Sequence, residues 1–156
     1  MKQHWVARMA GLGAMALVVL VGAGAGPASA TSGTGYDGTS PATTGCATGS
    51  YVIYSRNLYI GGSGAYVGAM EVRYSPACGT NWVRVYNQST TDGVSQKYVE
   101  RRAGNGLPYA QSGVNDAGLG WSYGNQIYAS GSTCIWVQGG IVTGAWTAWS
   151  PYVQIC

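Results

Sequence analysis

"RYSPACGTNWVRVYN", residues 73–87, is the segment that reveals the fold class of this chain most directly. In its second half, large aromatic or charged side chains alternate with Val83 and Val85, which is the period of a strand with one buried face. Ahead of that run, Pro76 and Gly79 bracket Cys78, a composition typical of a tight turn. The segment therefore predicts a β-hairpin with a cysteine in its turn.

The same strand-like composition recurs along most of the chain after Cys46. Segments rich in β-branched and aromatic residues are separated by turn signals such as "GGSG" at residues 61–64. Seven segments qualify as strands: 51–60, 65–74, 81–87, 94–101, 121–129, 133–138 and 144–155. No segment keeps the apolar i, i+3, i+4 spacing of an amphipathic helix for long. The sequence predicts an all-β domain, a small disulfide-stapled antiparallel sandwich or barrel of about seven strands.

Residues 1–30 have the features of a secretory signal peptide. Lys2 and Arg8 give a basic start, residues 10–21 are apolar, and small residues precede Ala30, so we expect cleavage after Ala30. The alternative is a membrane anchor, which the shortness of the apolar run and the lack of a basic stop disfavour. No later segment is apolar enough to cross a bilayer, so we expect a secreted, extracellular product without membrane insertion.

The next segment, "TSGTGYDGTSPATTG" at residues 31–45, has a different composition. Gly, Ser, Thr and Pro leave it little apolar surface to bury, so we expect a flexible N-terminal arm. Two roles stay open for it, a solvated leader stub or an arm that orders on a partner by adding a strand. Residues 46–156 then form a single β domain.

All four cysteines follow the expected leader. An even number in a small secreted domain predicts two disulfides, and four cysteines allow three pairings. We favour Cys46–Cys78 with Cys134–Cys156, one bridge near each end of the domain, although the sequence alone leaves the other pairings open. A zinc site is disfavoured because the chain has no C-x-x-C spacing.

The net charge argues against nucleic acid as a partner. The whole chain has a formal net charge of +3, with eight Lys and Arg against five Asp and Glu. Removal of Lys2 and Arg8 with the leader would lower it to +1. The remaining cations form no basic stripe of the kind that neutralises phosphates.

The residues available for catalysis argue against an enzyme. The only histidine, His4, lies in the expected leader, which excludes His-dependent nucleophiles and His-ligated metals in the secreted product. A turn or an ion pair accounts for each of the five carboxylates, and this disfavours a pair of catalytic carboxylates. Ser95 and Lys97 would share a strand face, but this spacing is too common to indicate a Ser–Lys dyad. We expect no catalytic residue, no metal and no cofactor.

The aromatic content favours a binding surface instead. The chain has twelve Tyr, six Trp and no Phe, and Tyr and Trp combine an apolar ring with a polar atom, as partner-binding surfaces require. The candidate partner-binding residues are Tyr36, Trp121, Tyr123, Trp146 and Trp149. The alternative is that these rings form the core, because a domain without Phe must fill its interior with other side chains.

A second group of residues, on and beside the opening segment, is interpreted as a structural frame. Glu71 alternates with Arg73 and is placed to pair across the hairpin with Arg84. Trp82 offers a ring face for a guanidinium, and Pro76 shapes the turn. This frame needs no ligand. The alternative is an Arg–Trp recognition patch for an anionic or sugar partner.

The opening segment also resembles the signature of a secreted bacterial family of unknown function, the YjfA-like family of actinobacteria. The shared pattern R-Y-S-P-x-C-x3-W-x-R falls on Arg73, Tyr74, Ser75, Pro76, Cys78, Trp82 and Arg84. The resemblance covers about residues 46–87, implies Cys46 as the partner of Cys78, and brings no catalytic residue with it.

In overall layout the chain is similar to the small adaptor of Streptomyces umbrella toxin particles. In those particles such a subunit links a repeat-bearing toxin polypeptide to a lectin subunit, through an extended N-terminal segment and a folded body. The resemblance implies a part in competition between bacteria and gives Tyr36 and its neighbours a partner to contact.

Together these observations predict a secreted, non-enzymatic binding module. We expect a protein–protein adaptor in an extracellular assembly such as a toxin particle, with a toxin scaffold and a lectin-type subunit as its partners. The alternative is a small lectin-like domain that binds carbohydrate or the cell wall. A third class is a secreted enzyme or enzyme inhibitor.

Overall fold

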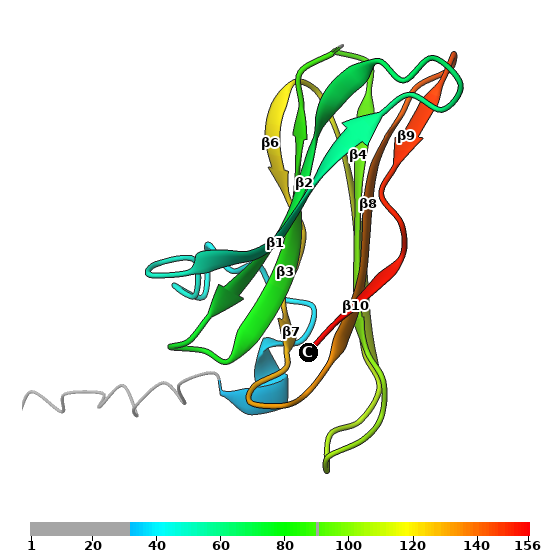
Figure 1. The fold of residues 1–156 in the computed structure, drawn as a ribbon. Coiled ribbons are helices and arrows are strands. Elements are labelled where there is room, and N and C mark those ends of the chain that lie inside the picture. The colour runs from blue at the N-terminus through cyan, green and yellow to red at the C-terminus, as the bar shows by residue number, and fades with distance from the viewer. Residues whose placement is uncertain (1–31, 90) are drawn as a thin grey trace, which may run out of the picture.

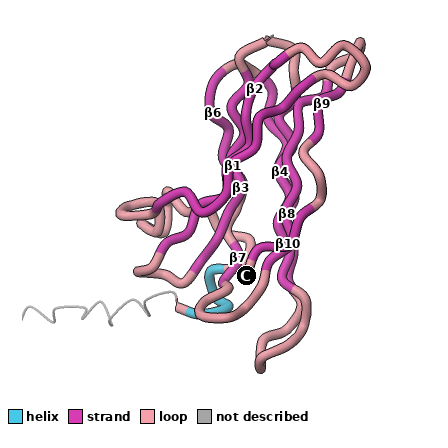
Figure 2. Tube along the Cα trace, in the orientation of Figure 1, coloured by secondary structure: helices cyan, strands magenta, loops and turns pink. Residues whose placement is uncertain are grey.

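Two antiparallel β-sheets packed face to face make up the molecule. The computed structural model describes residues 32–89 and 91–156, so the expected leader, residues 1–30, lies outside the described residues. Figure 1 shows the two sheets as layers, and Figure 2 shows that many of the connecting loops lie at the two ends of these layers. The expected all-β, antiparallel architecture is confirmed, and it takes the form of a sandwich.

Each sheet has five strands. The first, sheet 1, has the order β1-β2-β3-β6, with β7 also paired to β3, and the second, sheet 2, has the order β10-β8-β4-β5, with β9 also paired to β8. The strands of sheet 1 are β1 (Tyr51–Tyr59), β2 (Tyr66–Ser75), β3 (Thr80–Asn87), β6 (Gly120–Tyr123) and β7 (Ile127–Tyr128). The strands of sheet 2 are β4 (Val94–Arg101), β5 (Ala110–Ala117), β8 (Ile135–Val142), β9 (Thr147–Trp149) and β10 (Val153–Ile155).

The observed strands differ from the seven expected segments in three ways. The segment 133–138 corresponds to β8, which starts at Ile135 and continues to Val142. β5 was not expected, because "AQSGVNDA" is polar and nearly free of β-branched or aromatic residues, and it is stable as an edge strand paired with β4. Two expected segments are each split in two. The segment 121–129 breaks at Gly124, and the segment 144–155 breaks at Pro151, which has no N–H to donate to a ladder.

The hairpin predicted from residues 73–87 is formed by β2 and β3. Across it, Glu71 is paired with Arg84 and Arg73 with Trp82. The turn ends at Gly79, whose φ of +65° lies in the region that favours glycine. A Cβ atom at Gly79 would also lie 2.9 Å from the side chain of Tyr128, so this turn packs closely on the strand beside it.

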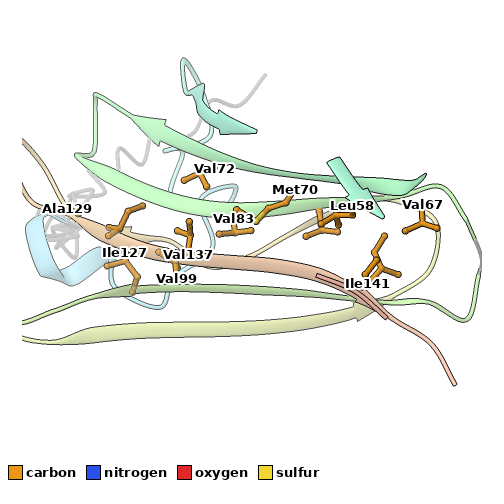
Figure 3. Close-up of a cluster of buried hydrophobic side chains, with 13 residues drawn as sticks. Leu58, Val67, Met70, Val72, Val83, Val99, Ile127, Ala129, Val137 and Ile141 are labelled. Carbon is orange, nitrogen blue, oxygen red and sulfur yellow. The ribbon is translucent and has the colours of Figure 1, made fainter. Parts of the chain in front are cut away.

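Aliphatic side chains, rather than aromatic rings, fill the space between the sheets (Figure 3). The cluster consists of Leu58, Val67, Met70, Val72, Val83, Val85, Val99, Ile127, Ala129, Ile135, Val137, Ile141 and Ala148. Burying one such large side chain contributes roughly 1.5–3 kcal/mol. Of the described tryptophans only Trp82 is fully buried, with 1 % of its surface exposed. The aliphatic core therefore leaves most of the rings at or near the surface.

The segment expected as a flexible arm is folded against the domain from Ser32 onwards. It contains the 3-10 helix η1 (Gly33–Tyr36) and a β-bridge between Thr39 and Gln126. The side chain of Gln126 is buried and donates to the hydroxyls of Thr39 and Thr44 at 3.0 and 2.8 Å. The folded body therefore begins before Cys46, which corrects the expected extent of the arm.

Asp37 supplies the charged attachment of this segment. Its carboxylate accepts hydrogen bonds from Arg101, with Nη1–Oδ1 and Nη2–Oδ2 distances of 3.1 and 2.8 Å, and from the backbone N–H of Tyr128 at 2.7 Å. The Arg101 side chain is fully buried. Composition did not reveal this attachment because a single carboxylate, and not an apolar surface, makes it.

The disulfides pair as favoured from the sequence. Cys46 is bonded to Cys78, which ties residues 32–45 and the chain before β1 to the β2–β3 turn. Cys134 is bonded to Cys156, which ties the last residue to the chain before β8. Two disulfides in a small β domain fit an extracellular protein. Helical structure in residues 32–89 and 91–156 includes nothing with the length and apolar character of a membrane span.

Candidate binding surfaces

The outer face of sheet 1 carries a cluster that we call the aromatic–arginine patch, made of Glu71, Arg84, Tyr86, Trp121 and Tyr123. β3 and β6 are neighbours in the sheet, and their register places Arg84 beside Tyr123 and Tyr86 beside Trp121. Alternation sends these side chains outward, because Val83 and Val85 between them face the core. The patch therefore unites residues from strands that are far apart in the sequence.

Arg84 is the centre of the aromatic–arginine patch. Its guanidinium carbon lies 4.0 Å from the centroid of the Trp121 ring and 6.0 Å from that of Tyr123. The Glu71 carboxylate accepts from Arg84 through Oε2, at 2.7 Å from Nε and 2.5 Å from Nη2. This ion pair was expected from the sequence. It leaves the guanidinium held between a carboxylate and an indole face, so little side-chain freedom remains to be lost on binding.

The chemistry of this patch suits recognition. Trp121 and Tyr123 are 38 % and 51 % exposed, and Glu71 offsets the charge of Arg84. Trp, Tyr and Arg are the side chains most often found at the energetic centres of protein interfaces. Two exposed rings beside a fixed guanidinium are therefore a surface suited to contact with a partner.

The frame residues behave differently from one another. Arg73 is fixed to Ser50, donating from Nη2 to the Ser50 carbonyl oxygen at 2.5 Å and from Nε to its hydroxyl at 3.0 Å. Pro76 lies exposed in the turn. Trp82 is buried, and its indole Nε1 has no hydrogen-bond partner. The sequence suggested Trp82 as a ring face for a guanidinium, and the ring that receives the Arg84 guanidinium is Trp121.

The other candidate partner-binding residues lie in separate places. Tyr36 is half-buried and lines a shallow pocket at the β2–β3 turn, together with Pro76 and Tyr128. Trp146 packs against the edge of the core. Trp149, 42 % exposed, lies on β9 at the edge of sheet 2. Of the five candidates, the structure brings only Trp121 and Tyr123 together.

Sequence reasoning missed a polar and aromatic cluster on the outer face of sheet 2. The Glu100 carboxylate accepts from the Tyr98 phenol at 2.7 Å and from Arg102 Nε at 3.3 Å. The Arg102 guanidinium carbon lies 4.1 Å from the centroid of the Trp136 ring, and Tyr98 contacts Tyr152 with ring centroids 6.2 Å apart. The signal was present in "VSQKYVER", where every second residue faces outward, but the partners from β8 and from the end of the chain could not be known.

The titratable groups of this cluster shift one another's pKa values. Hydrogen bonding from the Tyr98 phenol lowers the pKa of Glu100, and burial together with that carboxylate raises the pKa of Tyr98. Burial and Glu100 also raise the pKa of Tyr152 to about 12. At neutral pH the carboxyl group is therefore charged and both phenols keep their protons, so they remain hydrogen-bond donors.

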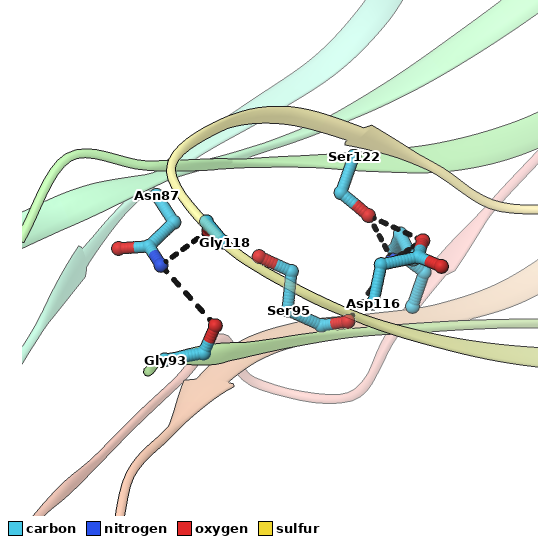
Figure 4. A network of polar contacts seen from close by, with 7 residues as sticks. Asn87, Gly93, Ser95, Asp116, Gly118 and Ser122 are labelled. Atoms are coloured by element: carbon cyan, nitrogen blue, oxygen red, sulfur yellow. Dashed lines mark hydrogen bonds and ion pairs between the residues drawn. The ribbon is translucent and has the colours of Figure 1, made fainter. Parts of the chain in front are cut away.

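Lys97 lies between the sheets and has a side chain that is 1 % exposed. Its Nζ donates to Asp116 Oδ2 at 2.7 Å, to the Ser95 carbonyl oxygen at 2.9 Å and to the Ser122 hydroxyl. Ser122 in turn donates to Asp116 at 2.6 Å, and Figure 4 shows Asp116 and Ser122 where the chain crosses from β5 to β6. Lys97 thus joins β4, β5 and β6.

The side chains of Ser95 and Lys97 do not pair with each other, as a Ser–Lys dyad at this spacing would require. Lys97 bonds the carbonyl of Ser95, while the Ser95 hydroxyl is buried without a partner. Burial lowers the pKa of Lys97, but the Asp116 carboxylate favours the ammonium form, and the hydrogen bond from Lys97 lowers the pKa of Asp116. A lysine that acts as a base must be neutral, so a structural role fits these contacts better.

Comparison with known proteins gives one match. The family model described as "Protein of unknown function (DUF2690)" matches residues 34–132, which include the β2–β3 hairpin, the aromatic–arginine patch and the Lys97 network. No curated protein and no solved structure matches the chain significantly. Within residues 32–89 and 91–156, no group of three or more His, Cys, Asp or Glu side chains is placed to hold a metal ion.

Proposed function

Because this chain belongs to the family of proteins of unknown function DUF2690, we propose its function from its surfaces: it is a non-enzymatic adaptor that joins secreted proteins. The proposed assembly is an extracellular toxin particle, in which the chain links a scaffold polypeptide to a lectin-type subunit. The similarity of its disulfide-stapled layout to the small adaptor of umbrella toxin particles supports this assignment.

The observation that carries the proposal is the aromatic–arginine patch. Exposed Trp121 and Tyr123 flank an Arg84 that Glu71 already holds in place. Ordering such side chains in advance removes part of the entropy cost of association, which is a common source of affinity in protein interfaces. A partner that fits this surface presents an apolar or aromatic group to the rings and a hydrogen-bond acceptor to the guanidinium.

An adaptor also needs a second contact surface, and β1 is suited to provide it. β1 is nine residues long and forms one edge of sheet 1, while β6 lies at the other end of the strand order. Tyr51, Val52 and Ile53 on it are exposed. An exposed edge strand offers unpaired N–H and C=O groups to an added strand. Two partners bound at β1 and at the aromatic–arginine patch would therefore lie at different edges of the sheet.

The experiment is affinity capture of the tagged, secreted protein from culture supernatant, followed by reconstitution with the purified candidates. We expect two different secreted proteins to bind at once, giving a ternary complex on size-exclusion chromatography. Trp121→Ala should lose one partner, with binding weakened at least about tenfold, because it removes a ring central to the surface.

The matched control is Tyr109→Ala, which removes a ring that is 51 % exposed but lies outside the aromatic–arginine patch. This variant should bind both partners like the wild type. Deleting residues 31–45 is a poor test, because it would leave the buried Arg101 without its carboxylate. Failure to capture any secreted protein, or equal binding by Trp121→Ala and the wild type, would rule out the proposed role of the patch.

A further inference from the structure

Trp149 is held in an unusual position on the outer face of sheet 2. It is paired across the β8–β9 ladder with Gly140, and a Cβ atom at Gly140 would lie 2.4 Å from Cε3 and 2.7 Å from Cδ2 of the indole. The ring therefore covers the backbone of β8 at a point where only glycine leaves room for it. Although it rests on the sheet, the side chain is still 42 % exposed.

The segment that carries Trp149 is held against β8 by hydrogen bonds of the next residue. The next residue, Ser150, is 2 % exposed, and its backbone N–H donates to the Gly139 carbonyl at 2.8 Å. In return, the Gly139 N–H donates to the Ser150 hydroxyl at 3.0 Å. The indole is therefore placed by strand pairing and by a buried side chain, and not by a loose loop.

Two hollows adjoin Trp149, and polar side chains contribute to the walls of both. The first, of about 260 Å³, is lined on the outer face of sheet 2 by three amide side chains, those of Gln96, Asn115 and Gln138, and by Tyr98. The second, of about 560 Å³, is lined towards β1 by Ser55, Arg56, Asn57, Tyr59 and Pro151. Trp149 lines both, so the two hollows adjoin one exposed ring.

From this arrangement we infer that Trp149 is the centre of a carbohydrate-binding site that takes an oligosaccharide of pyranose sugars. A pyranose ring presents C–H groups on its faces, which pack on an indole, and hydroxyl groups around its rim. Each hydroxyl both donates and accepts hydrogen bonds, and an amide side chain matches it because it offers both kinds of group. The two hollows provide room for sugars next to the ring.

The same features make a protein partner a poorer fit for this surface. Protein interfaces are built around a desolvated core that is richer in apolar groups than its rim. Around Trp149 the neighbours are instead mostly amides and hydroxyls, with Arg56 as the one cation that the side of β1 contributes. Trp149 lies on the other sheet from the aromatic–arginine patch, and the second hollow extends from it to β1 of sheet 1. None of the patch residues lines either hollow, so this inference does not rest on the proposed role of the patch.

The test is calorimetric titration of the secreted protein with cellotetraose, chitotetraose and tetragalacturonate. We expect at least one tetrasaccharide to bind with a Kd below about 1 mM. Trp149→Ala should weaken that binding at least about tenfold, and Gly140→Ala should also weaken it because the added methyl displaces the indole. Trp121→Ala, which removes a ring of similar exposure on the other sheet, should leave saccharide binding unchanged.

Further variants identify the class of sugar and provide a test that does not depend on the folding of Trp149→Ala. Loss of tetragalacturonate binding in Arg56→Ala would assign the site to acidic sugars, whereas unchanged binding of a neutral tetrasaccharide in that variant would assign it to neutral ones. If circular dichroism shows that Trp149→Ala does not fold, Gln96→Ala and Asn115→Ala replace it as the test variants, because both amides line the first hollow. The inference is overturned if none of the three saccharides binds at up to about 10 mM, if Trp149→Ala binds normally, or if Trp149→Ala loses a protein partner instead.

Discussion

Lys97 illustrates how a single buried charge can be tolerated in this small core. Its ammonium group is removed from water, and Asp116, Ser122 and the Ser95 carbonyl replace the lost hydration. The Asp116 side chain is 50 % exposed, so water still screens this ion pair on one side. The sequence placed Lys97 on the same strand face as Ser95, but it could not show that residues from β5 and β6, which belong to different sheets, would complete the network.

This interpretation is tested by comparing how much two substitutions lower the free energy of unfolding. Asp116→Ala leaves the buried ammonium without its counter-charge and should lower the free energy of unfolding by about 1–3 kcal/mol, less than for a fully buried pair. Lys97→Met replaces the charge with an apolar side chain of similar length and should cost less than about 1.5 kcal/mol. Urea denaturation of both variants measures the two values.

The double variant Lys97→Met/Asp116→Ala is the control. Because the two residues are in contact, its loss should be smaller than the sum of the two single losses. A Lys97→Met variant that is less stable than Asp116→Ala would mean that the network stabilises the fold more than the buried charge destabilises it, contrary to this interpretation.

At the level of elements, the segment 32–45 shows how a sequence of turn residues can be ordered by a few directed contacts. It packs no large apolar side chain into the core cluster, and it is attached through Asp37, through the hydroxyls near Gln126 and through the Cys46–Cys78 disulfide. Hydrogen bonds to a charged group are worth roughly twice as much as neutral ones, which offsets the entropy of ordering a glycine-rich chain.

Removing the Asp37 carboxylate should therefore affect both stability and local order. Asp37→Ala leaves the fully buried Arg101 side chain without its counter-charge, although the carbonyls of Pro108 and Tyr128 still accept from it, so we expect the free energy of unfolding to fall by about 2–4 kcal/mol. Limited proteolysis should then cleave within residues 32–45 faster than in the wild type. Thr43→Ala, an exposed change in the same segment, should alter stability by less than about 0.5 kcal/mol. Equal protease resistance in Asp37→Ala would show that other contacts hold the segment.

β5 and the short strands are the elements that local patterns described least well. β5 is polar and exposed along much of its length and is ordered by pairing with β4. By contrast, the β2–β3 hairpin was predictable in detail, including the Glu71–Arg84 pair, because alternation and a short turn set its register. A hairpin is a local structure, whereas an edge strand depends on its neighbour.

In the whole molecule, the two disulfides brace different ends of the described chain. Cys46 and Cys78 are separated by 32 residues and Cys134 and Cys156 by 22. Loop-closure entropy depends only weakly on loop length, so we expect removal of either bridge, as a double Cys→Ser variant, to lower the free energy of unfolding by about 3–4 kcal/mol. Urea denaturation of the two variants measures this.

The two variants should differ in what else they release. Loss of Cys46–Cys78 should also loosen residues 32–45, whereas loss of Cys134–Cys156 should loosen the chain around β10, and hydrogen exchange distinguishes the two regions. A loss below about 1 kcal/mol for either variant would mean that the unfolded chain is already constrained without that bridge.

Local pattern alone was sufficient for the all-β class, the hairpin and the ion pair within it, because the period of two dictates which way each side chain faces on a strand. The favoured disulfide pairing was also correct. Only the tertiary structure shows which strands are neighbours in a sheet. β6 lies beside β3 although more than thirty residues separate Asn87 from Gly120, and this pairing places Trp121 over Arg84. Strand order and the covering of Gly140 by Trp149 depend on the packing energy of both sheets together, which no local segment contains.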